Sequence, residues 1–469
     1  MKKHKKHIIS TIIIIFILYL IAGGVLPFYH HKKPSDAVKE NFDAKNFYSD
    51  KEGYERVRLI NDNIEALLWR LRIIESAQNE IIMSTFDFCD DESGQNIMAA
   101  LMNAADRDVQ VKIIVDGING MLHLKGRSNF KALTLHPNIE VKFYNPVNIF
   151  KPWEINLRMH DKYLIADDLV YILGGRNTCN LFLGNYSENA NIDYDLLVYE
   201  TASENNDNSL AQLKNYFEKI YALSSNKRIE YHSNKKTTAA TEYLSAHYNS
   251  LKELYPEVFE PTDYTAYTIG TDKITLCTNP NNIENKNPDL WYMMHQLMMR
   301  GENIIIQTPY IICSNDMYKD LNQLGDNAKS FEIITNAVEK GANPWGCTDY
   351  LNQKDNILKT GAEIYEVLRN HSTHTKSIII DDSISIVGSY NLDMRSTYLD
   401  TEMMLVVDCK ELNEILRADT DIIKEQGKHV YIDGSFEYGS QFTAVEMSIG
   451  KKAFYSVLKI LIRPVRHLL

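Results

Sequence analysis

The chain begins with a short basic segment followed by a long apolar stretch. Residues 1–7 read MKKHKKH, and the 22 residues at 8–29 carry no charged side chain. As a helix, this stretch is about 33 Å long, which is enough to cross the hydrocarbon core of a bilayer. A buried core helix is seldom apolar on every face, and the apolar part of a cleaved signal peptide is usually shorter. We therefore predict a membrane anchor, although Ala22-Gly23-Gly24 resembles a cleavage site.

Basic residues on the two sides of the apolar stretch indicate its orientation. Four lysines precede it within residues 1–7, whereas only Lys32 and Lys33 follow closely. Positive charge favours the cytoplasmic side of a membrane span. We therefore expect a single-pass protein of the cell membrane whose globular part lies outside the cytoplasm.

Beyond a polar juxtamembrane linker, helical and strand patterns alternate along the first half of the chain. Apolar side chains at Ile64, Leu67, Leu68 and Leu71 recur at the spacing of one helix face, and the short apolar runs between such helices are typical of buried strands. The predicted elements lie at residues 64–77, 81–83, 94–105, 109–115, 141–144 and 163–166. Strands that alternate with helices predict an α/β fold with a largely parallel sheet and helices on its faces.

The same order of elements returns in the second half. Helical and strand patterns lie at residues 290–299, 304–306, 317–324, 331–334, 364–365 and 377–380. We therefore predict two copies of one α/β unit, joined by the polar stretch 224–262. The expected division is an anchor and linker at residues 1–50, a first domain at 51–235, a linker and second domain at 236–445, and a C-terminal segment at 446–469.

The C-terminal segment is basic and amphipathic. Between residues 451 and 469, apolar side chains recur every three or four positions, and five Lys and Arg residues lie between them. Such a segment suits an anionic membrane surface, and it fits a terminal helix packed on the protein body equally well. Pro464 would kink either helix.

Composition narrows the classes of function. The 469 residues carry 50 Lys and Arg against 62 Asp and Glu, and the formal net charge of −12 gives no overall attraction to nucleic acid. The six cysteines are scattered without a CxxC pair, which excludes a zinc ribbon and a disulfide-rich scaffold but leaves one or two disulfides open. No group of His, Cys and carboxylates has the sequence spacing of a zinc site, so we expect neither a metal nor a cofactor.

One motif occurs twice with identical spacing, and both copies fit H-x-K-x4-D-x6-G-(G/S)-x-N. The first copy consists of His160, Lys162, Asp167, Gly174, Gly175 and Asn177, and the second of His374, Lys376, Asp381, Gly388, Ser389 and Asn391. A single H-x-K arises easily by chance, and a lone histidine is more often a satisfied core residue. Two copies that match at six positions indicate a functional site.

The residue types of this motif suit chemistry at a phosphate. Alternate residues of a strand face the same side, so each histidine points with the lysine two positions later. If the copies face each other, two ammonium groups would stabilise a phosphate, and two imidazoles would supply a nucleophile and a general acid. Asn177 and Asn391 can each donate an amide N–H to a phosphate oxygen. Asp167 and Asp381 fall too far along their strands to reach it, so we interpret them as structural members of the motif.

The pattern resembles the phospholipase D superfamily, whose signature is a duplicated H-x-K-x4-D. The resemblance covers about residues 55 to 445 and implies two tandem phospholipase D-like α/β/α sandwich domains that form one catalytic site without a metal. It implies that one of His160 and His374 becomes a phosphohistidine and that the other protonates the leaving alcohol, without deciding which is the nucleophile. The phosphate-oxygen ligands that it implies are Lys162, Lys376, Asn177 and Asn391.

An acidic residue follows each motif, directly ahead of an apolar strand. These residues are Asp193 in the first half and Glu402 in the second. In the family such an acid hydrogen-bonds a motif histidine and holds its tautomer. The resemblance therefore implies that Asp193 and Glu402 orient the histidines, the alternative being solvated carboxylates at strand ends.

Finer features are similar to the cardiolipin synthase branch of the superfamily. They include Phe-Asp-Phe at residues 86–88, Gly-Gly-Arg-Asn at 174–177, Thr-Pro-Tyr at 308–310 and, most closely, Gly-Ser-Tyr-Asn-Leu-Asp-Met-Arg-Ser at 388–396. They imply a membrane-anchored phosphatidyltransferase that makes cardiolipin from phosphatidylglycerol and a second phospholipid. The alternatives are a phospholipase D-type hydrolase, a nuclease, which the charge and the anchor disfavour, and an inactive scaffold, which two intact motifs disfavour.

Two loops bear on the acceptor of the phosphatidyl group. Residues 178–182 read Thr-Cys-Asn-Leu-Phe where the usual members carry Ile-Gly-Asp-Glu-Tyr-Phe, and we expect this loop near the lipid head group. The loop at 146–153 carries Ile149, Phe150 and Trp153, which suit either the bilayer interface or packing on the domain. The expected partners are phospholipid substrates and the membrane bilayer, without nucleic acid. The sequence leaves open the oligomeric state and whether the acceptor is phosphatidylglycerol, phosphatidylethanolamine or water.

Overall fold

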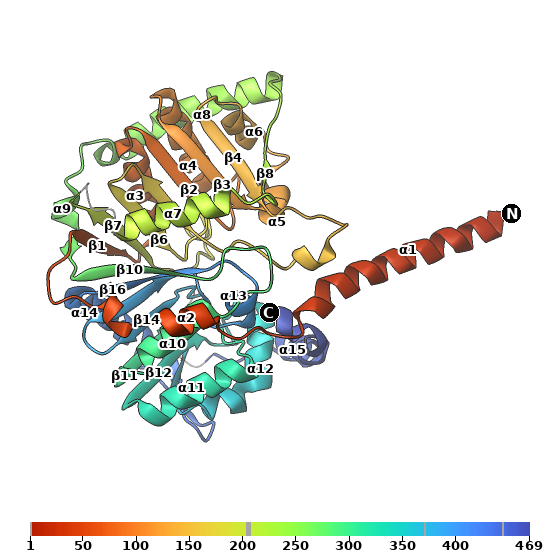
Figure 1. Cartoon of the computed structure of the whole chain (residues 1–469), viewed down its shortest axis with the longest axis vertical. Coiled ribbons are helices and arrows are strands. Elements are labelled where there is room, and N and C mark those ends of the chain that lie inside the picture. The colour runs from red at the N-terminus through yellow and green to blue at the C-terminus, as the bar shows by residue number, and fades with distance from the viewer. Residues whose placement is uncertain (1, 203–207, 370–371, 443–444) are drawn as a thin grey trace.

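The computed structural model describes residues 2–202, 208–369, 372–442 and 445–469. Within this part of the chain, two mixed sheets of nine strands each are covered by helices, and one long N-terminal helix projects from the body (Figure 1). The predicted α/β class with two tandem domains of the phospholipase D type is confirmed.

The first sheet has the strand order β8-β4-β3-β2-β5-β6-β7-β1-β9. Its strands are β1 (Glu55–Ile60), β2 (Glu80–Thr85), β3 (Gln110–Asp116), β4 (Ile139–Tyr144), β5 (Tyr163–Ala166), β6 (Val170–Gly174), β7 (Asp195–Glu200), β8 (Lys227–Arg228) and β9 (Ile269–Gly270).

The second sheet repeats this topology. Read from one edge its order is β18-β17-β13-β12-β11-β14-β15-β16-β10, so that β11 corresponds to β2, β14 to β5 and β16 to β7. Its strands are β10 (Lys273–Thr278), β11 (Asn303–Gln307), β12 (Ser330–Asn336), β13 (Glu363–Val367), β14 (Ser377–Ile380), β15 (Ile384–Gly388), β16 (Met403–Asp408), β17 (Gly427–Val430) and β18 (Phe436–Tyr438).

Only three neighbouring strands in each sheet run parallel, namely β2-β3-β4 and β11-β12-β13. The other strand pairs of the described chain are antiparallel, so the prediction of a largely parallel sheet is wrong. The reason lies in the motif itself, because a tight turn at Asp167 joins β5 to β6 and another at Asp381 joins β14 to β15. A tight turn returns the chain antiparallel, whereas a parallel neighbour needs a long crossover.

The buried apolar residues of the described chain form three cores, which the two sheets and their helices separate. The outer face of the first sheet packs against α3, α4, α6 and α8, and that of the second sheet against α10, α11 and α12. The third core lies between the sheets and contains α7 and α14, with Leu213, Phe217, Leu412 and Leu416 packed among strand residues of both halves. This shared core fixes the two motifs relative to each other.

The helices that follow α1 and α2 are α3 (Asn63–Ser76), α4 (Glu92–Asp106), α5 (Gly117–Asn119), α6 (Ser128–Thr134), α7 (Ser209–Tyr221), α8 (Lys235–Leu254), α9 (Tyr264–Tyr267), α10 (Asp289–Met298), α11 (Asn315–Asn327), α12 (Pro344–Leu358), α13 (Met394–Tyr398), α14 (Lys410–Lys424) and α15 (Ile449–Leu461).

The polar stretch between the halves is more ordered than its composition predicts. It contains α8, whose Ala240, Leu244, Tyr248 and Leu251 form a buried stripe at helical spacing against α4 and α6. Strand β9 then pairs with β1 of the first sheet. The linking segment therefore packs on the first half as far as Gly270.

The N-terminal helix α1 (Lys2–Val25) belongs to a stretch that is long and apolar enough to cross a membrane. The most apolar 18 residues of this stretch, His7–Phe28, are almost entirely exposed (Figure 1). The polar segment after it, which includes α2 (Asp36–Asn41), runs along the second half. There Phe28 and Phe47 are buried in the core, and Ser35 Oγ donates to Asp289 of α10 at 2.8 Å.

Candidate active site

The two motifs meet across the boundary between the halves. The backbone N–H of His160 donates to the carbonyl of Thr401 at 3.2 Å, and the N–H of His374 donates to the carbonyl of Ile192 at 2.7 Å. These are isolated bridges between the strand-like segment of one motif and the segment ahead of the other half's acidic residue. Each motif histidine therefore lies beside the carboxylate of the other half.

The histidine–carboxylate pairs are crossed between the halves. His160 Nδ1 lies 2.8 Å from Glu402 Oε1, and His374 Nδ1 lies 2.6 Å from Asp193 Oδ2. Both carboxylates are fully buried. A buried carboxylate at this distance keeps the proton on Nδ1 as its donor, so Nε2 of each ring is left as the reactive nitrogen.

A buried lysine lies beside each motif histidine. Lys162 Nζ donates to the His160 carbonyl at 2.5 Å. Lys376 Nζ donates to the His374 carbonyl and lies 2.6 Å from Nδ1 and 3.1 Å from Nε2 of that histidine. Burial lowers the pKa of Lys162 to about 7, with the neighbouring Lys376 ammonium adding to the shift, and burial lowers the pKa of Lys376 to about 8. Two desolvated cations at one place favour an anionic ligand.

The same burial acts differently on the two carboxylates. It raises the pKa of Glu402 to about 8, against the opposing effects of Lys162 and of the hydroxyls of Ser389 and Ser396. At Asp193 burial also raises the pKa, but Lys376 and His374 outweigh it and hold the pKa below its usual range. Burial lowers the pKa of His374 to about 3 and that of His160 well below its ordinary value, so both rings are neutral at neutral pH.

Asn177 and Asn391 lie at the ends of their motifs and are almost fully buried. Asn177 Oδ1 accepts the backbone N–H of Asp87 at 3.3 Å. Asn391 Nδ2 donates to the hydroxyl of Tyr310 at 3.2 Å, while its Oδ1 has no partner among the described residues. The side-chain amide of Asn391 is thus already hydrogen-bonded to the Tyr310 hydroxyl at the place where a phosphate would bind.

Asp167 and Asp381 lie at the far ends of their strands, in turns with φ of 55° and 45°. The carboxylate of Asp167 accepts the backbone N–H groups of Asn79 and Glu80, each at 2.8 Å, and that of Asp381 accepts those of Glu302 and Asn303 at 2.9 and 2.8 Å. Each Asp therefore holds the start of the central strand beside its motif, away from the histidines.

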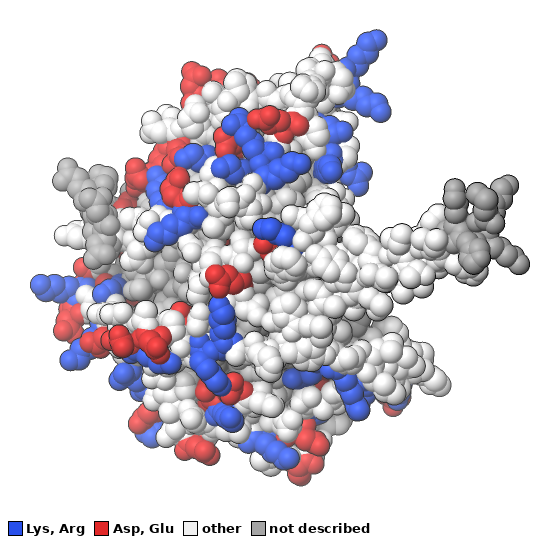
Figure 2. All heavy atoms as spheres, turned by 45° about the vertical axis from the view of Figure 1, so that its right-hand side comes forward, with Lys and Arg blue, Asp and Glu red and all other residues white. Residues whose placement is uncertain are grey.

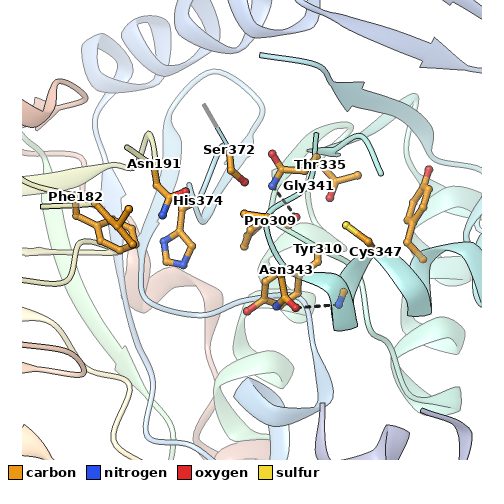
Figure 3. Close-up of a pocket in the computed structure, with 15 residues that line it drawn as sticks. Phe182, Asn191, Pro309, Tyr310, Thr335, Gly341, Asn343, Cys347, Ser372 and His374 are labelled. Carbon is orange, nitrogen blue, oxygen red and sulfur yellow. Dashed lines mark hydrogen bonds between the residues drawn. The ribbon is translucent and has the colours of Figure 1, made fainter. Parts of the chain in front are cut away.

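A cavity of about 270 Å³ opens beside His374 (Figure 3). Phe182 and Asn191 of the first half line one side, and Tyr310, Thr335 and Asn343 of the second half line the other (Figure 3). The loop at 178–182 thus reaches the cavity, since the Phe182 ring lies 4.9 Å from the His374 ring.

Sequence reasoning missed the groups that hold Glu402. Ser389 and Ser396 both donate their hydroxyls to this carboxylate, the latter at 2.6 Å. The available signal was the serine of the second motif at the position where the first motif has Gly175. Reasoning from the sequence also gave no role to Phe86, whose ring packs 4.9 Å from that of His160.

Comparisons with known proteins agree with this architecture. The family described as "Cardiolipin synthase, PLD-like domain" matches residues 71–221 and 293–422. An uncharacterized protein of Helicobacter pylori (strain ATCC 700392 / 26695) is 26% identical over 411 residues, which cover 80% of each chain. Cardiolipin synthase C of Escherichia coli (strain K12) is 24% identical over 401 residues, covering 76% of this chain and 82% of the relative. The crystal structure of a phosphatidylserine synthase from Haemophilus influenzae Rd KW20 shares the fold, with a TM-score of 0.65 at 15% identity over 92% of this chain and 100% of that one.

Proposed function

The chain belongs to the phospholipase D superfamily, in its cardiolipin synthase branch, and from this membership we propose that it is a membrane-anchored phosphatidyltransferase. It forms cardiolipin from phosphatidylglycerol and a second phospholipid through a phosphohistidine intermediate. The observation that supports this most is the crossed arrangement of His160 with Glu402 and of His374 with Asp193 around two buried lysines.

In the first step, the phosphate of the donor lipid binds between the two H-x-K pairs. Its negative charge offsets the cost of burying Lys162 and Lys376 and keeps both protonated. One motif histidine attacks phosphorus through Nε2, and the bond from phosphorus to the leaving alcohol oxygen breaks. The other histidine, which the bound anion helps to protonate, gives its Nε2 proton to that oxygen.

In the second step, the hydroxyl of the acceptor lipid attacks the phosphohistidine. It gives its proton to the histidine that acted as the acid, and the phosphorus–nitrogen bond breaks to regenerate both rings. Water would complete the same step as a hydrolysis, so a transferase must exclude it.

We propose that the loop ahead of the first motif helps to exclude water. It packs against α1, where the Tyr19 hydroxyl donates to the carbonyl of Phe150 at 3.0 Å and the Asn156 amide donates to the carbonyl of Gly24 at 2.6 Å. Tyr19 lies six residues before the end of α1 at Val25, or about 9 Å along the helix axis. If α1 crosses the bilayer, Phe150, which is 76% exposed, lies at the depth of the lipid.

The exposed apolar residues of the C-terminal helix α15 indicate a membrane-facing surface near the base of α1. Tyr455 and Leu458 pack inward, whereas Val457, Ile460 and Leu461 are exposed. Figure 2 shows few charged side chains on the surface around the base of α1. We propose that this face rests on the bilayer, with the N-terminus inside and the two domains outside the cytoplasm.

The purified full-length chain in vesicles tests this function. With phosphatidylglycerol alone, and with added phosphatidylethanolamine, we expect cardiolipin as the main product and none from His160→Asn or His374→Asn. Phosphatidic acid as the main product would instead make the protein a hydrolase. No turnover of either lipid would reject the proposal.

A further inference from the structure

Folding gathers a second cluster of reactive side chains beside the first motif, and no spacing in the sequence predicts it. The ligand atoms of Asp87, Cys89 and His123 lie within 4.8 Å of one another, as do those of Cys89, Asp91 and Cys179. Asp87 and Cys89 follow β2, His123 lies on a π-helical turn after β3, and Cys179 follows the first motif. Cys89 belongs to both groups and joins them.

The distances within this cluster resemble those around a metal ion. Cys89 Sγ lies 3.7 Å from Asp87 Oδ1 and 3.9 Å from His123 Nδ1. Neighbouring ligand atoms of a tetrahedral zinc ion lie about 3.3 to 3.8 Å apart, given Zn–N of about 2.0 Å and Zn–S of about 2.3 Å. His123 Nδ1 and Asp87 Oδ1, now 2.6 Å apart in a hydrogen bond, would separate as the ion replaces the shared proton.

Of the two remaining side chains, Cys179 fits the fourth position better than Asp91. Asp91 is engaged by the backbone, since Oδ1 accepts the N–H of Gly94 at 3.1 Å as the N-cap of α4 and Oδ2 accepts that of Asn180 at 2.8 Å. Cys179 is buried with its Sγ within 4.8 Å of the ligand atoms of Cys89 and Asp91, and it would have to turn toward Asp87 and His123 to complete the set. We propose that Asp87, Cys89, His123 and Cys179 bind one zinc ion.

The donor set determines both the kind of metal and its role. Two thiolates and an imidazole favour zinc over magnesium or calcium, which take oxygen ligands. Four protein ligands leave no open position for a substrate, so the ion is structural and takes no part in phosphatidyl transfer. His123 is 41% exposed, which gives the ion a path from solvent.

The site would brace the loop that carries Asn177 and Phe182. The N–H of Cys89 donates to the carbonyl of Thr178 at 3.1 Å, and the N–H of Thr178 donates to the carbonyl of Asp87 at 2.9 Å. A metal bound by residues of both segments adds a cross-link to these two hydrogen bonds. It would therefore hold one wall of the cavity at a fixed distance from β2.

Metal content of the full-length protein, purified under reducing conditions with zinc and then dialysed, tests the proposal. We expect one zinc ion per chain and, after replacement by cobalt alone, the absorption bands of a tetrahedral cobalt–thiolate centre. Cys89→Ser and Cys179→Ser should each weaken zinc binding by at least about tenfold. Cys313→Ser is the matched control, because Cys313 is a fully buried cysteine at the corresponding place after β11 and should leave zinc content unchanged.

Thermal melting keeps the proposal testable if a cysteine variant folds poorly. Zinc should raise the melting temperature of the metal-free wild type, because an ion that binds only the folded chain stabilises it. Absence of both bound zinc and the cobalt bands in the wild type overturns the proposal.

Discussion

The two halves repeat one topology but hold their acidic residues differently, and a single motif position marks the difference. At Gly175 of the first half, an added Cβ would lie 2.4 Å from the carboxylate oxygens of Asp193, so only glycine leaves room for this short acid. At the same position of the second half, Ser389 donates its hydroxyl to the longer Glu402. The duplicated motif thus forms two unequal half-sites, each made of a motif histidine and the acidic residue beside it: His160 with Glu402 and His374 with Asp193.

The inequality is one of charge. Asp193 lies 3.7 Å from the ammonium of Lys376, and its lowered pKa keeps it ionised. Glu402 is surrounded by hydroxyls, and burial raises its pKa to about 8. His374 therefore faces an acid that holds its negative charge firmly, whereas His160 faces one that gives up its charge close to neutral pH. We expect the two half-sites to fail in different ways when they are changed.

The largest effect is expected at the histidines themselves. His160→Asn and His374→Asn should each lower turnover by about 10⁴-fold or more, since one removes the nucleophile and the other the general acid. A phosphodiester with a good leaving group needs no acid, so it should rescue one variant only, and only that variant should still accumulate phosphohistidine. Wild-type-like turnover in either variant contradicts the assignment.

The carboxylates come next and compare the half-sites directly. Asp193→Asn should lower kcat by about 10³ to 10⁴, as when the ionised acid of a catalytic triad becomes an amide. Glu402→Gln should lower kcat only about tenfold, which corresponds to the loss of one hydrogen bond, because a glutamine oxygen can still accept from Ser389 and Ser396. Circular dichroism and melting temperature serve as controls for folding. Equal losses in the two variants would show that the half-sites carry the same charge.

The lysines give a pH dependence with a defined sign. Their lowered pKa values mean that the free enzyme loses positive charge as the pH rises through about 7 at Lys162 and about 8 at Lys376. We expect kcat/KM to fall through this window by up to about tenfold per pH unit, and the fall in kcat to come at higher pH because bound phosphate keeps the lysines charged. Lys162→Arg, which stays charged, should remove the first part of the fall. A flat profile contradicts the prediction.

The smallest effect concerns the loop that the first half presents beside α1. Phe150→Ser with Trp153→Ser should raise phosphatidic acid relative to cardiolipin by up to about tenfold, since withdrawing a large apolar side chain from lipid costs about 1.5 kcal/mol or more. Total turnover should fall less than the product ratio changes. The control is Ile422→Ser, which changes an exposed apolar residue of α14, on the opposite side of the body from α1 (Figure 1). An unchanged ratio would place the water barrier elsewhere.

Local patterns predicted most of the elements but not how they pair. The helical spacing of Leu67 and Leu71 and the apolar run at Ile81 are found in α3 and β2. The antiparallel return of β5 and the burial of α8 were not predicted, because strand direction depends on connections and a polar helix shows its apolar stripe only beside its partner. The roles of Asn177, Asn391 and the other site residues stay predictions until they are measured.

By itself the sequence determined the duplicated motif, the α/β class and the apolar N-terminal stretch, because residue spacing and periodicity are properties of the chain read in order. Only the tertiary structure decided that Asp193 serves His374, 181 residues away, and that Glu402 serves His160, 242 residues away. It also decided that Cys89 meets Asp87 and His123 in one group and Asp91 and Cys179 in another. These pairings depend on how two sheets pack around α7 and α14, and no local pattern in the sequence encodes the distance between side chains brought together by that packing.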